Sequence, residues 1–184
     1  MKRRSFLKNA AVALPVAGFG GLSLSQLASA QQADGAHLVN AGEDRLGETH
    51  SLGFSTILFK VLPRETSDNL FTIEHKNLVH GGPPVHLHHS QEEWYYVIQG
   101  RILFQVGDER KLLGPGDSLL GPRGIPHAFV GQGDSPARMI IAFSPAGKME
   151  AFFREAAVPN GPKMDAALFA RFDMQYVGPP LAVG

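Results

Sequence analysis

The sequence predicts an all-β sandwich or barrel followed by one or two helices. Short runs rich in apolar, aromatic and β-branched residues follow one another between residues 55 and 143. Gly, Pro, Asp and Asn separate these runs, and such spacing is typical of strands and turns in sandwiches and barrels. No segment is repeated along the chain, so we expect a single barrel.

The predicted strands are short, and the turns between them are tight. Gly100 alone separates two of them, while "GDER" at 107–110 and "PGD" at 115–117 are typical of hairpin turns. The predicted strands cover residues 55–62, 69–79, 93–99, 101–106, 117–121, 127–131 and 137–143.

The pattern changes from strand to helix after residue 145. A second helix is expected from about Asp165 to Arg171, followed by an extended, proline-rich end. In the first helix apolar residues recur at the i, i+3, i+4 and i+7 spacing of an amphipathic helix, at Met149, Phe152, Phe153 and Ala156.

Residues 1–30 have the order of a secretory signal peptide. A basic start and an interrupted apolar run precede the small residues Ala28 to Ala30, which fit a cleavage site. The apolar run is short for a membrane span, so no stable membrane insertion is expected after cleavage. The remaining chain is expected to comprise a flexible linker at 31–50, the barrel at 51–145, and helices with an extended tail at 146–184.

The basic start also resembles a known export signal. The run Arg3-Arg4-Ser5-Phe6-Leu7-Lys8 is similar to the twin-arginine signal, with Lys2 where Ser or Thr is usual. This resemblance implies export of a folded, cofactor-loaded protein to the periplasm or beyond. An ordinary secretory signal and an uncleaved anchor are the alternatives.

Composition excludes several classes of partner and site. The chain has 17 basic and 17 acidic residues. Four of the basic residues lie in the signal, so the mature chain carries a net charge of about −4. Nothing basic remains to attract nucleic acid or an anionic membrane. The chain has no cysteine, so a metal would have to be held by His, Asp or Glu.

Two histidines and a glutamate suggest such a metal site. His86 and His88 lie two apart, and on a strand such residues share one face. Glu93 opens the next predicted strand, with Glu92 just before it. His127 follows the stiff loop "GPRGIP" and opens its own strand. Imidazole with carboxylate suits Fe, Mn, Ni, Cu or Zn rather than an all-oxygen Ca or Mg site.

The spacing of these residues resembles the two cupin motifs. The first is Gly, five residues, His-x-His, three or four residues, Glu, six residues, Gly. His86, His88, Glu93 and Gly100 match it, whereas Gly81 stands one position closer to the histidines than the first glycine of the motif.

The second cupin motif is Gly, five residues, Pro-x-Gly, two residues, His, three residues, Asn. Gly116, Pro122, Gly124 and His127 match, and Gly131 replaces the final Asn, which is not a ligand.

The resemblance to cupins implies a double-stranded β-helix barrel of the jelly-roll type. It also implies one divalent transition metal (Fe, Mn, Ni, Cu or Zn) held by His86, His88, Glu93 and His127. Glu92 would also satisfy the family spacing from His88, but the six residues before Gly100 favour Glu93.

The chain further resembles small cupins described as quercetin-dioxygenase-like, in "SPAGKMEAFFRE" and "MQYVGPPL". This resemblance implies a homodimeric dioxygenase-type oxidoreductase acting on a small enol, catechol or flavonol-like substrate. Glu93 would be the catalytic residue, as a ligand or as the base for a substrate hydroxyl. A fold does not fix a reaction. A metal-dependent isomerase, lyase or hydrolase, or a non-catalytic metal- or ligand-binding protein, therefore stays open.

Three other residues are candidates for contact with the small-molecule substrate. Tyr95 shares the strand face of Glu93, and Phe129 and Gln105 lie on other predicted strands. Barrel core is the alternative for the aromatic pair, and solvent is the alternative for Gln105. Trp94 and Tyr96 are expected on the outer strand face, against another sheet or a second subunit. The remaining histidines are expected to lie at the surface, or in the case of His89 to face away from the site: His37, His50, His75, His80 and His89.

Overall fold

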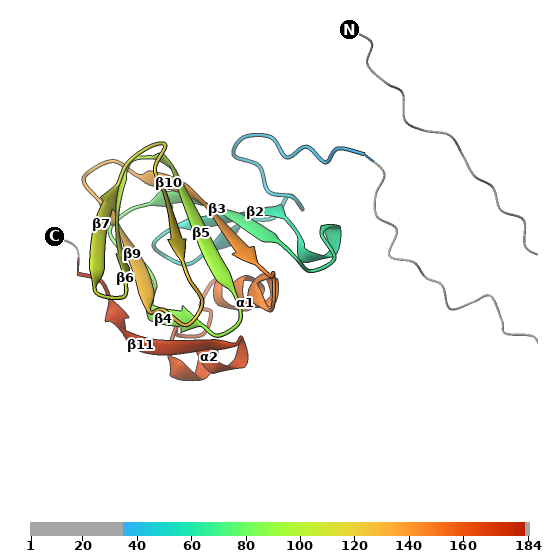
Figure 1. The fold of residues 1–184 in the computed structure, drawn as a ribbon. Helices are drawn as coiled ribbons and strands as arrows, with labels where there is room; N and C mark the ends of the chain where they lie inside the picture. Colours follow the sequence, from blue (N-terminus) through green and yellow to red (C-terminus); the bar gives the residue numbers. More distant parts are fainter. Residues whose placement is uncertain (1–34, 183–184) are drawn as a thin grey trace, which may run out of the picture. The chain divides into compact units, whose positions relative to one another are not determined.

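The structure is a computed structural model that describes residues 35–182 of the chain (Figure 1). The predicted signal peptide at 1–30 and the first residues of the predicted linker lie outside this range. Within it, two antiparallel sheets face each other and close a barrel. The predicted all-β class with C-terminal helices is confirmed.

Each sheet brings together strands that are distant in sequence. The first runs in the order β1 (His50–Ser51), β2 (Thr56–Val61), β3 (Phe71–Leu78), β10 (Ala137–Ser144), β5 (Glu92–Gln99) and β8 (Ser118–Gly121). The second runs in the order β11 (Met174–Pro180), β4 (Pro84–His88), β9 (His127–Gln132), β6 (Arg101–Val106) and β7 (Glu109–Leu113).

Alternation along the strands builds the core, because successive side chains point to opposite faces of a sheet. On β5 Glu93, Tyr95 and Val97 are buried, while Trp94 and Tyr96 are 40% and 38% exposed. The core on the inner face is strongly apolar. A polar side chain buried there is therefore unusual and calls for an explanation other than packing.

Two segments differ from the prediction. Strand β7 begins at Glu109, inside the segment predicted as a turn. The sequence did not indicate this strand, because its exposed charged residues show no alternation of apolar and polar positions. The extended end pairs with β4 as β11, with Tyr176 opposite His86. This strand was not predicted, because Pro179 and Pro180 argue against a strand. However, β11 lies at the edge of its sheet, where proline is tolerated.

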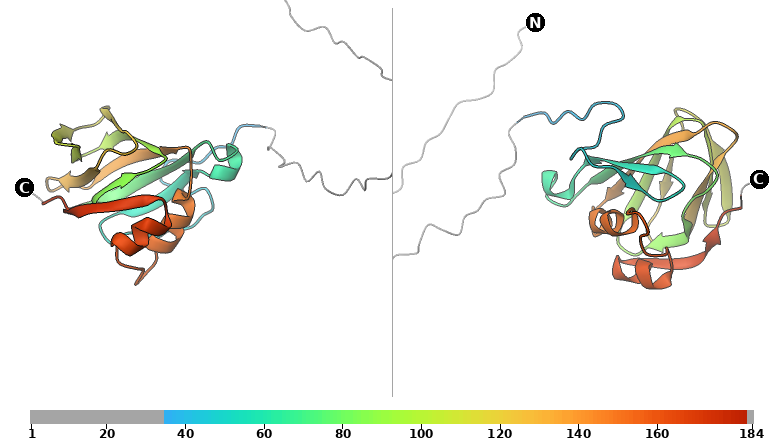
Figure 2. Two further views of the ribbon diagram at one scale, coloured as in Figure 1. Left: turned by 60° about the horizontal axis from the view of Figure 1, so that its bottom comes forward. Right: turned by 180° about the vertical axis from the view of Figure 1, so that it is seen from behind.

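The helices follow the predicted pattern. Helix α1 (Met149–Ala156) buries the four apolar residues of its stripe. In α2 (Ala166–Arg171) the Asp165 carboxylate accepts a hydrogen bond from Leu168 N at 3.0 Å and caps the helix. Phe152 of α1 stacks on Phe169 of α2 with ring centroids 5.8 Å apart, and Figure 2 shows both helices on the same side of the barrel.

Among the residues described, neither helix combines the length and apolar character that a membrane span needs.

The end of the predicted linker contacts the barrel. Asp44 accepts a hydrogen bond from Phe59 N at 2.5 Å, and Arg45 pairs with Glu65 after β2. Residues 35–49 form no strand or helix, yet these contacts hold their last part against the first sheet.

Arg138→Ala should destabilise the barrel by about 1–3 kcal/mol at pH 7. Its guanidinium donates to the buried Glu74 carboxylate at 2.6 and 2.9 Å, and Lys60 lies 3.1 Å from the other oxygen. Burial alone raises the pKa of Glu74, but the hydrogen bonds from Arg138 and Lys60 outweigh it and lower the pKa below 4.5.

Because the folded-state pKa is lowered, this stabilisation is present above the unfolded pKa and is lost as the pH falls through the folded one. Urea unfolding of wild type and Arg138→Ala should therefore differ most above about pH 5 and converge towards acid. Arg101→Ala, at an exposed arginine, is the control. An equal difference at pH 3 and pH 7 would contradict the assignment.

Candidate metal centre

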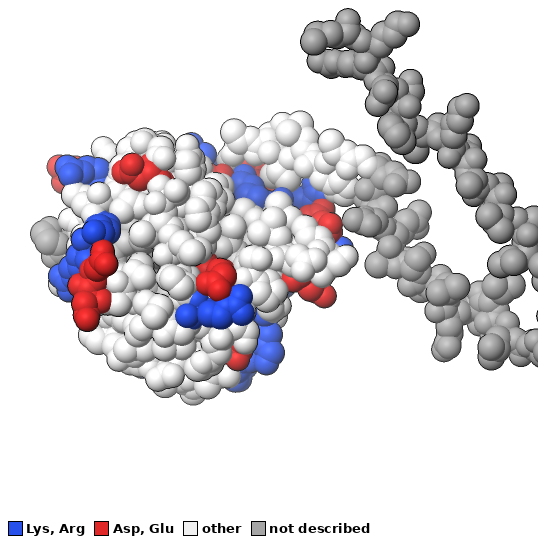
Figure 3. All heavy atoms as spheres, in the orientation of Figure 1, with Lys and Arg blue, Asp and Glu red and all other residues white. Residues whose placement is uncertain are grey.

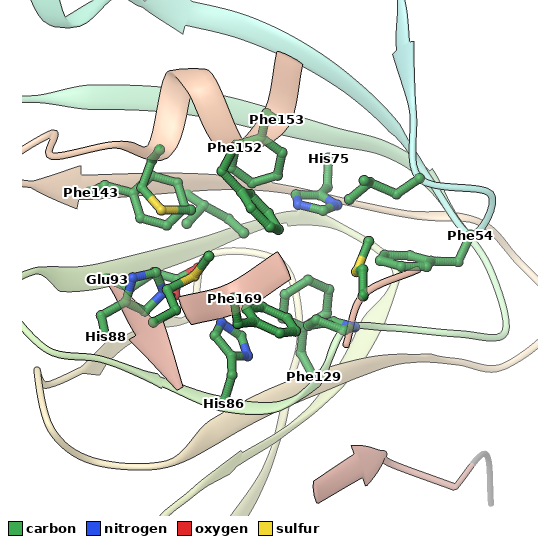
Figure 4. A pocket seen from close by; sticks show the side chains of 16 residues that line it. Phe54, His75, His86, His88, Glu93, Phe129, Phe143, Phe152, Phe153 and Phe169 are labelled. Carbon is green, nitrogen blue, oxygen red and sulfur yellow. The ribbon is translucent and has the colours of Figure 1, made fainter. Parts of the chain in front are cut away.

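Four buried side chains from three strands meet at one end of the barrel interior. His86 and His88 share a face of β4, and His127 on β9 lies directly opposite His86. Glu93 comes from β5 in the facing sheet. One ligand atom from each of the four lies within 4.8 Å of the others. The structure thus brings together the set predicted from the sequence, and Figure 4 shows His86, His88 and Glu93 on one side of a cavity.

Hydrogen bonds orient all three imidazoles in the same way. The Nδ1 atoms of His86 and His127 lie 2.8 and 2.9 Å from the carbonyl oxygens of Pro84 and Ile125. Carbonyl oxygens only accept, so each Nδ1 carries the hydrogen. Each Nε2 is therefore left to face the other members of the cluster, as metal-binding histidines require.

Gln91 orients His88 in the same manner. Its Nε2 donates to the carbonyl oxygens of Ala146 and Pro145 at 2.6 and 3.2 Å. These two acceptors fix the amide orientation, so Oε1 is the atom that accepts from His88 Nδ1 at 3.2 Å. Gln91 is buried, and sequence reasoning missed it because only its position three residues after His88 marks it.

The Glu93 carboxylate lies at the centre of the cluster. Its Oε2 is 3.0 Å from His127 Nε2 and 3.1 Å from His88 Nε2. The contact with His88 lacks hydrogen-bond geometry, so His88 Nε2 is a buried atom with no hydrogen-bond partner in the described part of the chain. Such an atom is costly. A transition metal would satisfy it, and the donor set of three imidazole nitrogens and one carboxylate fits such a metal.

The protonation states suit metal binding. Burial raises the pKa of Glu93, but the hydrogen bond with His127 and the close His88 ring outweigh it and hold the pKa well below 4.5. Burial, together with the neighbouring His127 and His88, lowers the pKa of His86 to about 3. Burial also lowers the pKa of His127, but Glu93 outweighs this and raises it. Glu93 is thus anionic and His86 neutral, the forms that bind metals.

The three predicted substrate contacts lie in different places. Phe129 lines the cavity. Tyr95 is buried. Burial first, and then the neighbouring Glu93 carboxylate, raises the pKa of Tyr95 well above 10, so its hydroxyl stays protonated. Gln105 does not line the cavity, and its Oε1 accepts from Arg110 Nε at 3.1 Å.

Glu92, the alternative ligand, lies outside the cluster. It accepts from Arg123 N and Nε at 2.8 and 2.5 Å. This pair ties the start of β5 to the loop before β9, which carries His127.

Two of the four histidines predicted at the surface are buried instead. His37 and His80 are exposed, but His50 and His75 are not. His75 alternates with Phe71 and Ile73 along β3. Strand parity therefore marked His75 as inward-facing, although no motif spacing did.

An apolar cavity of about 30 Å³ adjoins the cluster. This volume holds a water or two rather than a drug-sized molecule. Phenylalanine and methionine dominate its wall, as Figure 4 shows for the phenylalanines. Besides His86, His88 and Glu93, the lining residues are Leu52, Phe54, His75, Pro83, Phe129, Ile141, Phe143, Met149, Phe152, Phe153, Met164, Phe169 and Met174.

A larger outer cleft of about 680 Å³ lies beside the cavity. Leu52, Phe54 and Met164 line both spaces, so these three side chains separate the cluster cavity from the outer cleft. Segments 51–54 and 158–162 form much of the cleft wall.

Comparison with known families agrees with this geometry. Residues 78–143 match the family model described as "Cupin domain", and this segment contains all four cluster residues. This segment is similar to cupin domains. The match covers just over a third of the chain, and the sequence matches no curated protein.

Solved structures show the same cupin fold. KdgF from a Halomonas species is 20% identical with a TM-score of 0.51, and the match covers 60% of this chain and 94% of that one. An RmlC-like cupin from Shewanella frigidimarina NCIMB 400 is 20% identical with a TM-score of 0.52, and the match covers 63% and 96%. At this identity the likeness concerns the fold alone.

Gln91→Ala should weaken metal binding about 10- to 100-fold while leaving the barrel folded. The His88 ring would lose the acceptor that fixes its tautomer. Calorimetric titration of the metal-free protein with Zn²⁺ measures the effect. Gln99→Ala, at an exposed glutamine that ends β5, is the control. Unchanged affinity in Gln91→Ala would show that His88 does not need this hydrogen bond.

Proposed function

We propose that this cupin is a metal-dependent dioxygenase-type oxidoreductase that acts on a small enol, catechol or flavonol-like substrate. One observation carries the proposal: three imidazole nitrogens and one ionised carboxylate converge beside an apolar cavity, which His86, His88 and Glu93 help to line. A bound divalent metal would supply Lewis acidity and redox activity to a pair of substrate oxygens.

The residues of the chain would supply proton transfer and the exclusion of water. Glu93 is the one carboxylate among the described residues that line the cavity, and it is held ionised. It would accept the proton of a substrate hydroxyl. Phe152, Phe153 and Phe169 cover the cavity, which keeps water from the electron-rich substrate. Dioxygen would be the second substrate, and both of its atoms would enter the oxidised product.

The size of the cavity bears on the substrate. A space of about 30 Å³ holds no more than a water or two, so even a small enol would have to displace part of the cavity wall. A whole flavonol would need the wall at Met164 to move, or would lie partly in the outer cleft of about 680 Å³. The geometry therefore favours a small substrate over a flavonol.

We further propose export to the periplasm or beyond, and a homodimer. The signal-like sequence of residues 1–30 supports export. The outer sheet face supports a dimer, because Trp94 and Tyr96 stack there with ring centroids 5.9 Å apart and Leu120 is exposed beside them. Charged groups are scattered with mixed sign over the face in Figure 3, which offers no basic footprint for nucleic acid.

Metal analysis and oxygen uptake test the proposed function. We expect the mature protein from its own host to contain about one equivalent of Fe, Mn, Ni or Cu, as in His- and carboxylate-ligated sites, and to consume oxygen with small enols or catechols. Zinc alone with oxygen-independent turnover would point to a Lewis-acid enzyme. Metal without turnover of any substrate tried would favour a binding protein. Glu93→Gln serves as the inactive control.

A further inference from the structure

His75 is the one polar side chain, among the described residues that line the cavity, outside the metal cluster. It comes from β3 in the first sheet, whereas His86, His88 and His127 come from the second. It is 2% exposed. A substrate that entered and widened the cavity would therefore meet the metal cluster on one side and His75 on another; Figure 4 shows His75 apart from His86, His88 and Glu93 along the wall.

The ring of His75 is packed between aromatic side chains, and only one of its two nitrogens has a hydrogen bond in the described range. Its Nδ1 lies 2.8 Å from Ser55 Oγ, its one hydrogen bond in the described range. Phe54 stacks on the ring at 6.4 Å, and Phe129 meets it edge-on at 5.3 Å. Burial lowers the pKa of His75 to about 3, so the ring is neutral. Its Nε2 remains to exchange one hydrogen bond with a molecule in the cavity.

Packing alone does not explain this residue. In the sheet His75 lies opposite Ile57 on one side and Met139 on the other, both fully buried. An aliphatic residue would suit that position, whereas burial of a polar side chain there costs free energy unless its hydrogen bonds are made. Departures from apolar packing of this kind are expected at functional sites.

We propose that His75 is a specificity-determining residue that hydrogen-bonds a third oxygen of the substrate, away from the oxygen pair at the metal. The substrate class is thus an enol or catechol with one further hydroxyl or carbonyl group. The apolar wall of Phe129, Phe152 and Met164 would contact the carbon skeleton between the two polar ends. This inference rests on the proposed function, because it takes the metal cluster as the binding site of the oxygen pair.

Two matched ring compounds test the proposal on the zinc-loaded full chain, in which zinc prevents redox turnover. Kojic acid and allomaltol carry the same chelating hydroxy-ketone, and kojic acid has a hydroxymethyl group where allomaltol has a methyl group. We expect wild type to bind kojic acid about five- to tenfold more tightly by calorimetry, as one added hydrogen bond allows. His75→Phe should reverse or remove this preference.

Further variants separate a substrate contact from a structural role. His75→Gln keeps a polar group and should retain part of the preference. His50→Phe, at a buried histidine outside the cavity, should retain all of it. Zinc content should be unchanged throughout, and the Tm of His75→Phe should not fall. A structural role would instead lower the Tm and leave the ratio of the two affinities unchanged.

The outcomes distinguish the two proposals. If both compounds bind and the ratio is the same in wild type and His75→Phe, the inference about His75 is wrong and the proposed chelating function stands. If neither compound binds the zinc-loaded protein, the proposed substrate class fails, and the inference fails with it.

Discussion

His127→Ala should abolish tight metal binding while leaving a folded barrel. His127 supplies one of four converging ligand atoms and also contacts the Glu93 carboxylate at 3.0 Å. Loss of a partner that only orients a ligand already costs 10- to 100-fold in affinity, so loss of a ligand should cost at least about 100-fold. His86→Ala should behave in the same way, because His86 lies opposite His127 across β4 and β9.

The fold should survive these changes because the four ligands are a small part of the core. Most of the buried side chains are apolar and lie along the barrel and the two helices. Circular dichroism should therefore be unchanged, while elemental analysis after dialysis shows less than a tenth of an equivalent of metal, as expected from the weakened affinity.

His89→Ala provides the matched control for the two ligand variants. His89 directly follows His88 but is exposed at the end of the strand. Its removal should leave metal content at the wild-type level. Full occupancy in His86→Ala or His127→Ala would show that the ion is not held by this cluster.

The structure brings the four predicted ligands together, and the sequence could name them because part of their geometry is local. His86 and His88 lie two apart on one strand, so their common face follows from strand geometry without knowledge of the fold. Glu93 and His127 each open a strand, where the sequence patterns were clear. Only the resemblance to the cupin motifs, however, joined these separate strands into one site.

The residues around the ligands could not be predicted in the same way. Gln91 reaches Ala146, 55 positions along the chain, and no local pattern encodes such a contact. His75 had the right strand parity but no motif. Gln105 looked like a polar residue in an apolar strand, yet its partner is Arg110 across the β6–β7 hairpin. Long-range pairing decides these cases, and a single sequence does not show it.

Gly82→Ala should damage both the fold and the metal site. A Cβ on Gly82 would lie 1.8 Å from the carbonyl oxygen of Phe129 and 2.9 Å from its carbonyl carbon. Both are backbone atoms of β9, so no side chain can rotate to make room. The segment before β4 would have to move away from β9. We expect a loss of about 3 kcal/mol or more in the free energy of unfolding.

The same displacement should reach the metal ligands. Gly82 lies two residues before β4, and Phe129 lies two residues after His127 on β9. Strand β4 carries His86 opposite His127, and its pairing with β9 is at these two histidines. Separation of the two strands would therefore separate two of the ligands. Gly82→Ala should lose metal as His127→Ala does, and stability in addition.

Urea unfolding of the metal-free proteins is the appropriate measurement, because bound metal would itself add stability. Gly114→Ala is the matched control, since a Cβ there would meet only Asp117 Oδ2, at 4.0 Å. It should change the free energy of unfolding by less than about 0.5 kcal/mol. His127→Ala should lose metal with a smaller loss of stability, whereas Gly82→Ala should lose metal and at least about 3 kcal/mol. If Gly82→Ala unfolded at the wild-type urea concentration, β4 and β9 would not approach as closely as the structure shows.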